Sequence, residues 1–444
     1  ITLYLATALV AILPLTLVDL LLSLRFNFPD LLGGVAALSY GRLRPLHALG
    51  WLLGVYTTAA FGLIHYLVPK LCGTRLAGAG RLGFLTYGLW LLGLGLGAAG
   101  VLAGYNQGLE LAELPWFANI PLVAAFWLLT LQVMLTLFHR REPRLYVSLW
   151  YLAAALVWVD LDYPLGNFVL PWALAGVNSA AAHSLYMHYL YGLWINPVGL
   201  ALAYFLLPLS VRNPLYSHKL ALIGFWSMAF FFPFVGTQHY LYSPIANWVQ
   251  VISTVAGMML IIPVLTVLQN FYGTMSGQWR MLQDSNTAKF LCLGVVFYLV
   301  GSLQGATGGL LELQKWTHFT TYAAAHAHMT VAGAFILWMV AGYYYVWPRL
   351  AGAYLYSRAL ADWHFWLTVA GLSCLVIVES AAGLVQGSLW RYDVDFLYSL
   401  DAMRTFWWLR TLCGLPVLAG MWLFVYNLGR TWYAQRLDEA GGQP

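Results

Sequence analysis

Two histidines separated by one residue, His326 and His328, lie within a long apolar segment and carry the strongest chemical signal in this sequence. An α-helix turns by roughly 100° per residue, so these side chains point about 200° apart, toward opposite flanks of one helix. Imidazole is the commonest protein ligand of transition metals, and an ionisable group inside a membrane is costly. The spacing predicts one metal centre on each flank. The alternative is that both rings only satisfy neighbouring hydroxyl or carbonyl groups.

A third histidine offers a partner for one of these flanks. His47 opens another apolar segment at the predicted depth of His328, so the two rings could be the axial ligands of one iron porphyrin. Two axial imidazoles leave no open position, and such a heme carries electrons. His326, on the other flank, would hold a second iron that is open on its distal side, where chemistry can occur.

A second metal facing that open iron needs ligands from other segments at similar depth. His188 and the neighbouring pair Gln238 and His239 lie at the outer ends of two such segments. Read singly, each histidine could equally be a packed core residue. Together with His326 and His328, these three residues predict a combined metal site.

The elements that must position these side chains are membrane helices. The chain has 444 residues, of which 61% are hydrophobic and 8% are charged, against roughly 25% charged in a soluble domain. We therefore expect an all-α integral membrane protein, in one transmembrane domain over residues 1–444, with about twelve spans of roughly 20 residues each. The expected spans are 1–24, 45–69, 82–104, 116–138, 146–170, 186–209, 218–241, 246–271, 288–311, 319–347, 361–386 and 404–429.

Charge and cysteine usage narrow the setting. With a cytoplasmic N-terminus, fourteen Lys and Arg fall in inner loops and six in outer loops, so the positive-inside rule predicts that both termini are cytoplasmic. The net charge of +5 needs no nucleic-acid partner. The four cysteines are scattered, which predicts packing roles, with neither a disulfide framework nor a sulfur-ligated metal.

At this point the chain resembles the catalytic subunit I of the heme–copper oxidase superfamily, most closely the C-type oxidases and the nitric oxide reductases. The likeness spans almost the whole chain, and twelve spans with HxH on the tenth is the family arrangement. It is carried by GRLRPLH at 41–47, RNPLYSHKLALIGFW at 212–226, GTQHY at 236–240, THFTTYAAAHAH at 317–328 and QGSLWR at 386–391.

The resemblance assigns a role to each candidate. It implies that His47 and His328 bind a low-spin heme b, that His326 is the proximal ligand of a high-spin heme b, and that a non-heme iron or copper faces it. The ligands implied for that metal are His188, Gln238 and His239. Gln238 stands where the family usually has a histidine, and an amide oxygen is a weaker, harder ligand, so copper affinity should fall.

Two arginines match family positions near the heme propionates. They are Arg391 and Arg410, and a guanidinium suits bidentate pairing with a carboxylate. The alternative is that either one is an interfacial anchor.

Four departures from the family pattern concern the reaction. Phe232 stands where C-type oxidases have a cross-linked tyrosine that supplies an electron and a proton for splitting oxygen. Gln304 matches an oxidase glutamate, and Gly192 and Asn196 match two acids of the reductases. The loss of the tyrosine favours nitric oxide over oxygen as the substrate, while the loss of the acids removes the obvious proton relay.

Three acids are expected to lie at depth. They are Asp160, Asp162 and Glu379. None of them forms an obvious proton relay, and we expect Glu379 to be a structural residue paired with a hydroxyl.

The resulting hypothesis is a nitric oxide reductase of the bacterial inner membrane, with both termini cytoplasmic. It would be fed electrons through the low-spin heme by a partner subunit that carries a heme c or a copper domain. Three alternatives stay open: a nitric oxide dismutase that forms N2 and O2, a divergent C-type oxygen reductase, and a non-catalytic heme subunit that only conducts electrons.

Overall fold

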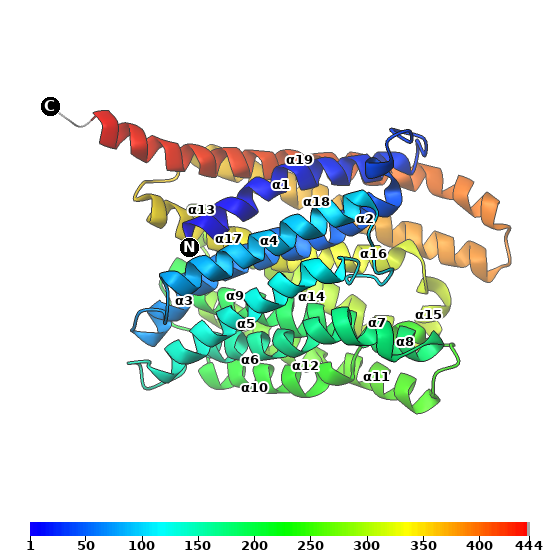
Figure 1. Cartoon of the computed structure of the whole chain (residues 1–444), viewed down its shortest axis with the longest axis horizontal. Helices are drawn as coiled ribbons and strands as arrows, with labels where there is room; N and C mark the ends of the chain where they lie inside the picture. Colours follow the sequence, from blue (N-terminus) through cyan, green and yellow to red (C-terminus); the bar gives the residue numbers. More distant parts are fainter. Residues whose placement is uncertain (442–444) are drawn as a thin grey trace.

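The computed structural model describes the backbone of residues 1–441 and the side chains as far as Tyr433. Arg436, one of the cations predicted to be cytoplasmic, therefore lies outside the described side chains. All regular structure in the described residues is helical, as predicted, and Figure 1 shows the long helices running side by side along one axis. The helices are α1 Thr2–Arg25, η1 Ala36–Leu38, α2 Tyr40–Leu49, η2 Gly50–Thr57, α3 Thr58–Cys72, α4 Arg81–Ala103, α5 Trp116–Phe138, α6 Val147–Pro164, η3 Leu165–Val169, α7 Leu170–Ala173, α8 Gly176–Tyr189, η4 Leu190–Ile195, α9 Asn196–Val211, α10 His218–Phe231, η5 Phe232–Phe234, η6 Thr237–Tyr240, α11 Asn247–Met259, α12 Ile261–Met275, α13 Met281–Asp284, α14 Asn286–Gly308, α15 Leu311–Thr317, α16 Thr321–Ala327, η7 His328–Ile336, α17 Leu337–Ala351, α18 Arg358–Arg391 and α19 Phe396–Gly441.

Eleven helical stretches in the described part of the chain are long and apolar enough to cross a membrane, against about twelve predicted. The predicted span at 146–170 is not among them. It is helical throughout, as α6, η3 and α7, and α6 packs between α5 and α9. Asp160 and Asp162 lie near its end, and two carboxylates lower the mean hydropathy of so short a helix.

Serine side chains cap the N-termini of several spans. Ser217, Ser285 and Ser357 each accept a hydrogen bond from the backbone N–H three residues later, at the start of α10, α14 and α18. Such N-caps satisfy donors that the first helical turn leaves free. They fix where each span begins, and so the depth of the side chains further along it.

Wide π-helical turns follow three of the predicted ligands. The segment η2 begins three residues after His47, η4 begins two residues after His188, and η7 begins at His328 itself. Single π-helical turns inside α-helices are rare and occur mostly at functional sites. The backbone therefore departs from regular α-helix at the histidines that the sequence singles out.

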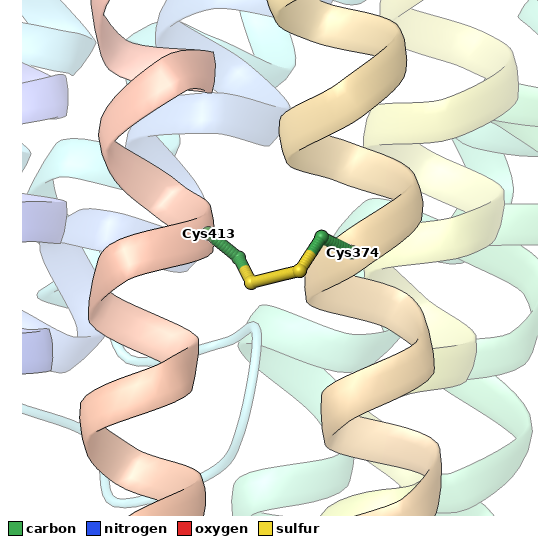
Figure 2. The surroundings of a disulfide bond; sticks show 2 residues. All are labelled: Cys374 and Cys413. Atoms are coloured by element: carbon green, nitrogen blue, oxygen red, sulfur yellow. A yellow bond between two sulfur atoms is a disulfide. The ribbon is translucent and has the colours of Figure 1, made fainter.

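The cysteine prediction is wrong for one pair. Cys374 of α18 and Cys413 of α19 form a disulfide, with Cα atoms 5.6 Å apart (Figure 2). Their separation of 39 residues hides the contact in the sequence, because it depends on two long helices packing in register. Cys72 and Cys292 are free, and Cys72 is buried, which agrees with the packing role predicted for them.

Candidate functional site

The rings of His47, on α2, and His328, at the start of η7, face each other. Their centroids are 6.4 Å apart and the ring planes are inclined by 72°. A metal held between two imidazole nitrogens at ~2 Å each would separate the ring centres by about 6 Å. The spacing therefore fits one iron bound by both rings, as the sequence predicts.

Each of these two rings has a carboxylate at its other nitrogen. The Nδ1–H of His47 donates to Asp19 Oδ1 of α1 at 2.5 Å, and that of His328 donates to Glu379 Oε2 of α18 at 2.6 Å. Because a carboxylate only accepts, the proton belongs to Nδ1 and Nε2 is left for a metal. Neither acid was predicted to act here, and the expectation that Glu379 pairs with a hydroxyl is wrong.

His326 lies on the opposite flank and packs against α14. A Cβ at Gly305 would lie 2.9 Å from its Cε1 and 3.3 Å from its Nε2, so a larger residue at 305 would force the ring to shift. Its Nδ1 is buried without a hydrogen-bond partner among the described residues. Ala323 and Ala327 on the same helix keep accessible surface. A small-residue face with an unpaired imidazole nitrogen fits a planar cofactor bound by that ring.

His188 and His239 converge at the ends of α8 and η6. Their Nε2 atoms are 2.6 Å apart, and Nε2 of Gln238 lies 3.2 Å from Nε2 of His188. Gly236, with φ of 149°, makes the turn that precedes the pair, and this backbone conformation favours glycine. The three predicted ligands are thus brought together.

The carboxamide of Gln238, however, presents its nitrogen to the histidines. Its oxygen, the atom that could bind a metal, accepts hydrogen bonds from the Gly236 N–H at 2.6 Å and from the Ser253 hydroxyl at 2.6 Å. The side chain would have to turn over and lose both bonds to become a ligand. As oriented, the site therefore offers a metal two imidazole rings and no amide oxygen, and among the described residues no group of three His, Cys, Asp or Glu could hold a metal ion.

Two of the departures from the family pattern occupy the same space. A Cβ at Gly192 would lie 1.7 Å from Cε1 and from Cζ of Phe232. The phenyl ring therefore fills the position where a side chain at 192 would begin, and its centroid is 6.2 Å from that of His188. A third departure, Asn196, is buried and donates to Met228 Sδ at 3.4 Å. Gln304 Oε1 is buried without a partner in the described structure.

The two arginines predicted at the propionates have other partners here. The Arg391 guanidinium lies over the Trp316 ring at 4.2 Å. Arg410 pairs through Nε with Glu379 Oε1 at 3.0 Å and lies over the Phe26 ring at 4.9 Å. These contacts leave the propionate role a prediction.

Two acids that the sequence analysis did not single out lie between α4 and α5, at the predicted outer end. Arg44 contacts Glu110 and also pairs with Glu113 at 3.3 Å. Burial raises the pKa of Glu113 to about 7. Glu110 lines a cavity of about 470 Å³ whose wall also includes His183, Met187 and Tyr240. The sequence could have indicated these two acids, because they are three residues apart in one short loop.

Comparison with known proteins gives one consistent result. The family model described as "Cytochrome C and Quinol oxidase polypeptide I" matches residues 1–416. The chain is 28% identical to "Cytochrome c oxidase subunit 1 homolog" of Agrobacterium tumefaciens, over 96% of this chain and 82% of the relative. It is 27% identical to "Cbb3-type cytochrome c oxidase subunit CcoN1" of Stutzerimonas stutzeri, over 90% and 88%.

A shorter match joins the chain to a reductase. It is 29% identical to one chain of the nitric oxide reductase of Stutzerimonas stutzeri, over 30% of each of the two proteins. A cryo-EM structure of a heme-copper terminal oxidase dimer shares its fold, with a TM-score of 0.74 and 16% identity over 96% of this chain and 83% of that one.

Proposed function

The chain belongs to the cytochrome c and quinol oxidase polypeptide I family, and from this premise we propose that it reduces nitric oxide to nitrous oxide. It is a multi-pass membrane protein and a respiratory oxidoreductase of the heme–copper superfamily, a family that implies hemes and a metal site. The substrate, the heme types and the metal are the parts that we propose.

The cofactor assignment follows the geometry of three rings. His47 and His328 would hold a low-spin heme b, and His326 would hold a high-spin heme b on the other flank of the same helix. When bound, these hemes supply one-electron transfer and a place for the gas to bind. Because His188 and His239 do not form a three-ligand site with Gln238 as it is oriented, no step is assigned to a non-heme metal.

The observation that carries the proposal is the packing of Phe232 on Gly192, beside His188. Four-electron reduction of oxygen by the family's usual route draws an electron and a proton from a phenol at position 232. A phenyl ring has neither to give. Reducing two NO to N2O and water takes only two electrons and two protons, so it does not need that phenol.

The proton path that we propose begins at the predicted outer end. Glu110 lines the same cavity as Tyr240, the residue directly after His239. Glu113, whose pKa is raised to about 7 by burial, shares Arg44 with Glu110. A carboxyl that is half protonated near neutral pH can both accept and release a proton there. These two acids supply the relay that the other segments lack.

The setting follows from the same assignment. We place the protein in the bacterial inner membrane with both termini cytoplasmic, and with a donor subunit that carries a heme c or a copper domain. Lipid surrounds the bundle, and no nucleic acid is involved.

One observation favours a second candidate, a nitric oxide dismutase. The rings of His188 and His239 have hydrogen bonds only to each other and to Gln238 among the described residues, and no carboxylate touches them. Converting two NO into N2 and O2 consumes no net electrons or protons, so it would need no acid there.

Product analysis tests the proposal. Purified holoprotein is supplied anaerobically with a one-electron reductant and ¹⁵NO, and the gases are followed by mass spectrometry. We expect one ¹⁵N2O for each two NO, with no oxygen. Oxygen evolution would instead establish the dismutase. Consumption of added oxygen without turnover of NO would establish an oxygen reductase. No turnover of either gas, with only one spectroscopically reactive heme and no non-heme metal, would support an electron-conducting subunit.

A further inference from the structure

We propose that Asp19 and Glu379 lower the reduction potential of the low-spin heme, by placing a carboxylate behind each of its two axial histidines. The inference depends on the heme assignment of the proposed function, and it is independent of which gas reacts. Asp19 and Glu379 act as positioning residues, because they touch the ligands and not the iron.

The arrangement is nearly symmetrical although its parts come from distant segments. Asp19 on α1 accepts from Nδ1 of His47 at 2.5 Å, and Glu379 on α18 accepts from Nδ1 of His328 at 2.6 Å. The two rings that these acids hold face each other with centroids 6.4 Å apart. Both axial positions of a single iron are therefore backed by a formal negative charge.

Each carboxylate has a second polar partner at its other oxygen, which is a hydrogen bond for Asp19 and an ion pair without a hydrogen bond for Glu379. The Trp51 indole N–H donates to the other oxygen of Asp19 at 2.9 Å, and Nε of Arg410 pairs with the other oxygen of Glu379 at 3.0 Å. Glu379 is 1% exposed, and a charge this deep in a membrane protein is rare and usually functional. The acids are held with one oxygen on the imidazole, so neither is a surface charge that meets the ring by chance.

The electronic effect has a definite sign. A carboxylate that accepts the N–H of a coordinated imidazole makes that ring a stronger donor to the metal. Added electron density stabilises Fe³⁺ more than Fe²⁺, so the midpoint potential of the one-electron couple falls. Two such ligands act on the same iron. A given one-electron donor therefore reduces this heme less favourably than it would a heme whose axial histidines lack carboxylate partners.

The two acids should not contribute equally. The second oxygen of Asp19 bonds to a neutral indole, whereas the charge of Glu379 is shared with a guanidinium. A paired carboxylate attracts the imidazole proton less. We therefore expect the larger part of the effect from Asp19, even though Glu379 is the more deeply buried.

An optical redox titration of the full-length holoprotein tests the inference. The variants are D19N, E379Q and the double substitution, in which the amide oxygen can still accept from Nδ1 but the charge is gone. The matched control is D401N, which removes an exposed carboxylate that pairs with Arg404 on α19. The readout is the midpoint potential of the low-spin heme, measured without any gas substrate.

We expect each substitution to raise that potential. Second-shell partners of metal-bound histidines are typically worth 10-fold to 100-fold. A tenfold loss of preference for Fe³⁺ equals a rise of 59 mV for one electron. D19N should exceed E379Q, the double variant should exceed both, and D401N should leave the potential unchanged. An unchanged or lowered potential in D19N and E379Q, with the bis-histidine spectrum intact, overturns the inference.

A second variant keeps the test decisive if D19N and E379Q lose the heme. W51F removes the donor from the outer oxygen of Asp19 and leaves its bond to His47, so the carboxylate should attract the imidazole proton more strongly. The potential should then fall below that of the natural protein. A rise in W51F overturns the inference. None of these results depends on turnover of NO, so a failure of the proposed reaction would be seen separately.

Discussion

Two pairs of histidines lie on either side of α16 and η7, and their surroundings differ in charge. Around His47 and His328 the chain places carboxylates in direct contact with both rings. Around His188 and His239 no described carboxylate touches the rings, and Phe232, at the position that the resemblance matches to a phenol of C-type oxidases, packs on Gly192, which it matches to an acid of the reductases. Under the proposed function, carboxylates set the potential of the electron-carrying region, defined by His47 and His328, whereas the gas-binding region, defined by His188 and His239, has no described carboxylate on its rings.

The largest expected effect is the loss of the electron-carrying region alone. H47A removes one axial ligand, so the absorption of the six-coordinate low-spin heme should disappear completely. The other heme, held by His326 on the opposite flank, should still bind carbon monoxide in the reduced protein. Optical difference spectra measure both. Persistence of the low-spin spectrum in H47A would refute the assignment.

The next largest effect probes the packing in the gas-binding region. G192A adds a Cβ that must displace the Phe232 ring, and overpacking of this kind costs about 1–3 kcal/mol. We expect a lower thermal unfolding temperature, partly restored when F232L is added, because the smaller side chain gives way. Differential scanning fluorimetry in detergent measures the cycle. Strict additivity of the two substitutions would show that residues 192 and 232 do not compete for space.

A third prediction concerns the outer acids. The pKa of Glu113 lies at about 7, raised from its usual value by burial, so the protonated form predominates below pH 7 and is lost above it. If this carboxyl passes protons inward, NO turnover should fall as the pH rises through 7. E113Q should reduce turnover several-fold and flatten that part of the pH profile. An unchanged profile in E113Q would exclude Glu113 from the relay.

The smallest expected effect is a change in the potential of the low-spin heme. R410Q removes the cation that shares the charge of Glu379, so the carboxylate should polarise His328 more strongly. The low-spin potential should then fall modestly, opposite in sign to the change expected for E379Q. A redox titration of both variants in the same membranes compares them. A change of the same sign in both would show that disruption of the site, and not charge, moves the potential.

The helical membrane fold could be predicted from the sequence. So could the pair of histidines that face each other. Helical periodicity predicts that residues two apart point to opposite flanks, and in the structure His328 contacts Glu379 of α18 whereas His326 lies beside Gly305 of α14. The departures at Phe232 and Gly192 could also be read from single positions. Their mutual exclusion could not, because it depends on how closely η4 and η5 approach.

The carboxylate partners lay beyond sequence reasoning for a similar reason. Asp19 is 28 residues from His47 and Glu379 is 51 from His328, so only the packing of α1 and α18 brings them to the rings. The disulfide between α18 and α19 was missed on the same grounds. The orientation of Gln238 depends on Ser253, 15 residues away on another helix.

Carbon monoxide binding to the fully reduced holoprotein tests the central claim most directly. With two hemes on opposite flanks of one helix, and only one of them closed by a second histidine, half of the total heme should form the carbon monoxide adduct while the other half keeps its six-coordinate spectrum. Reaction of all the heme, or of none, would contradict the account.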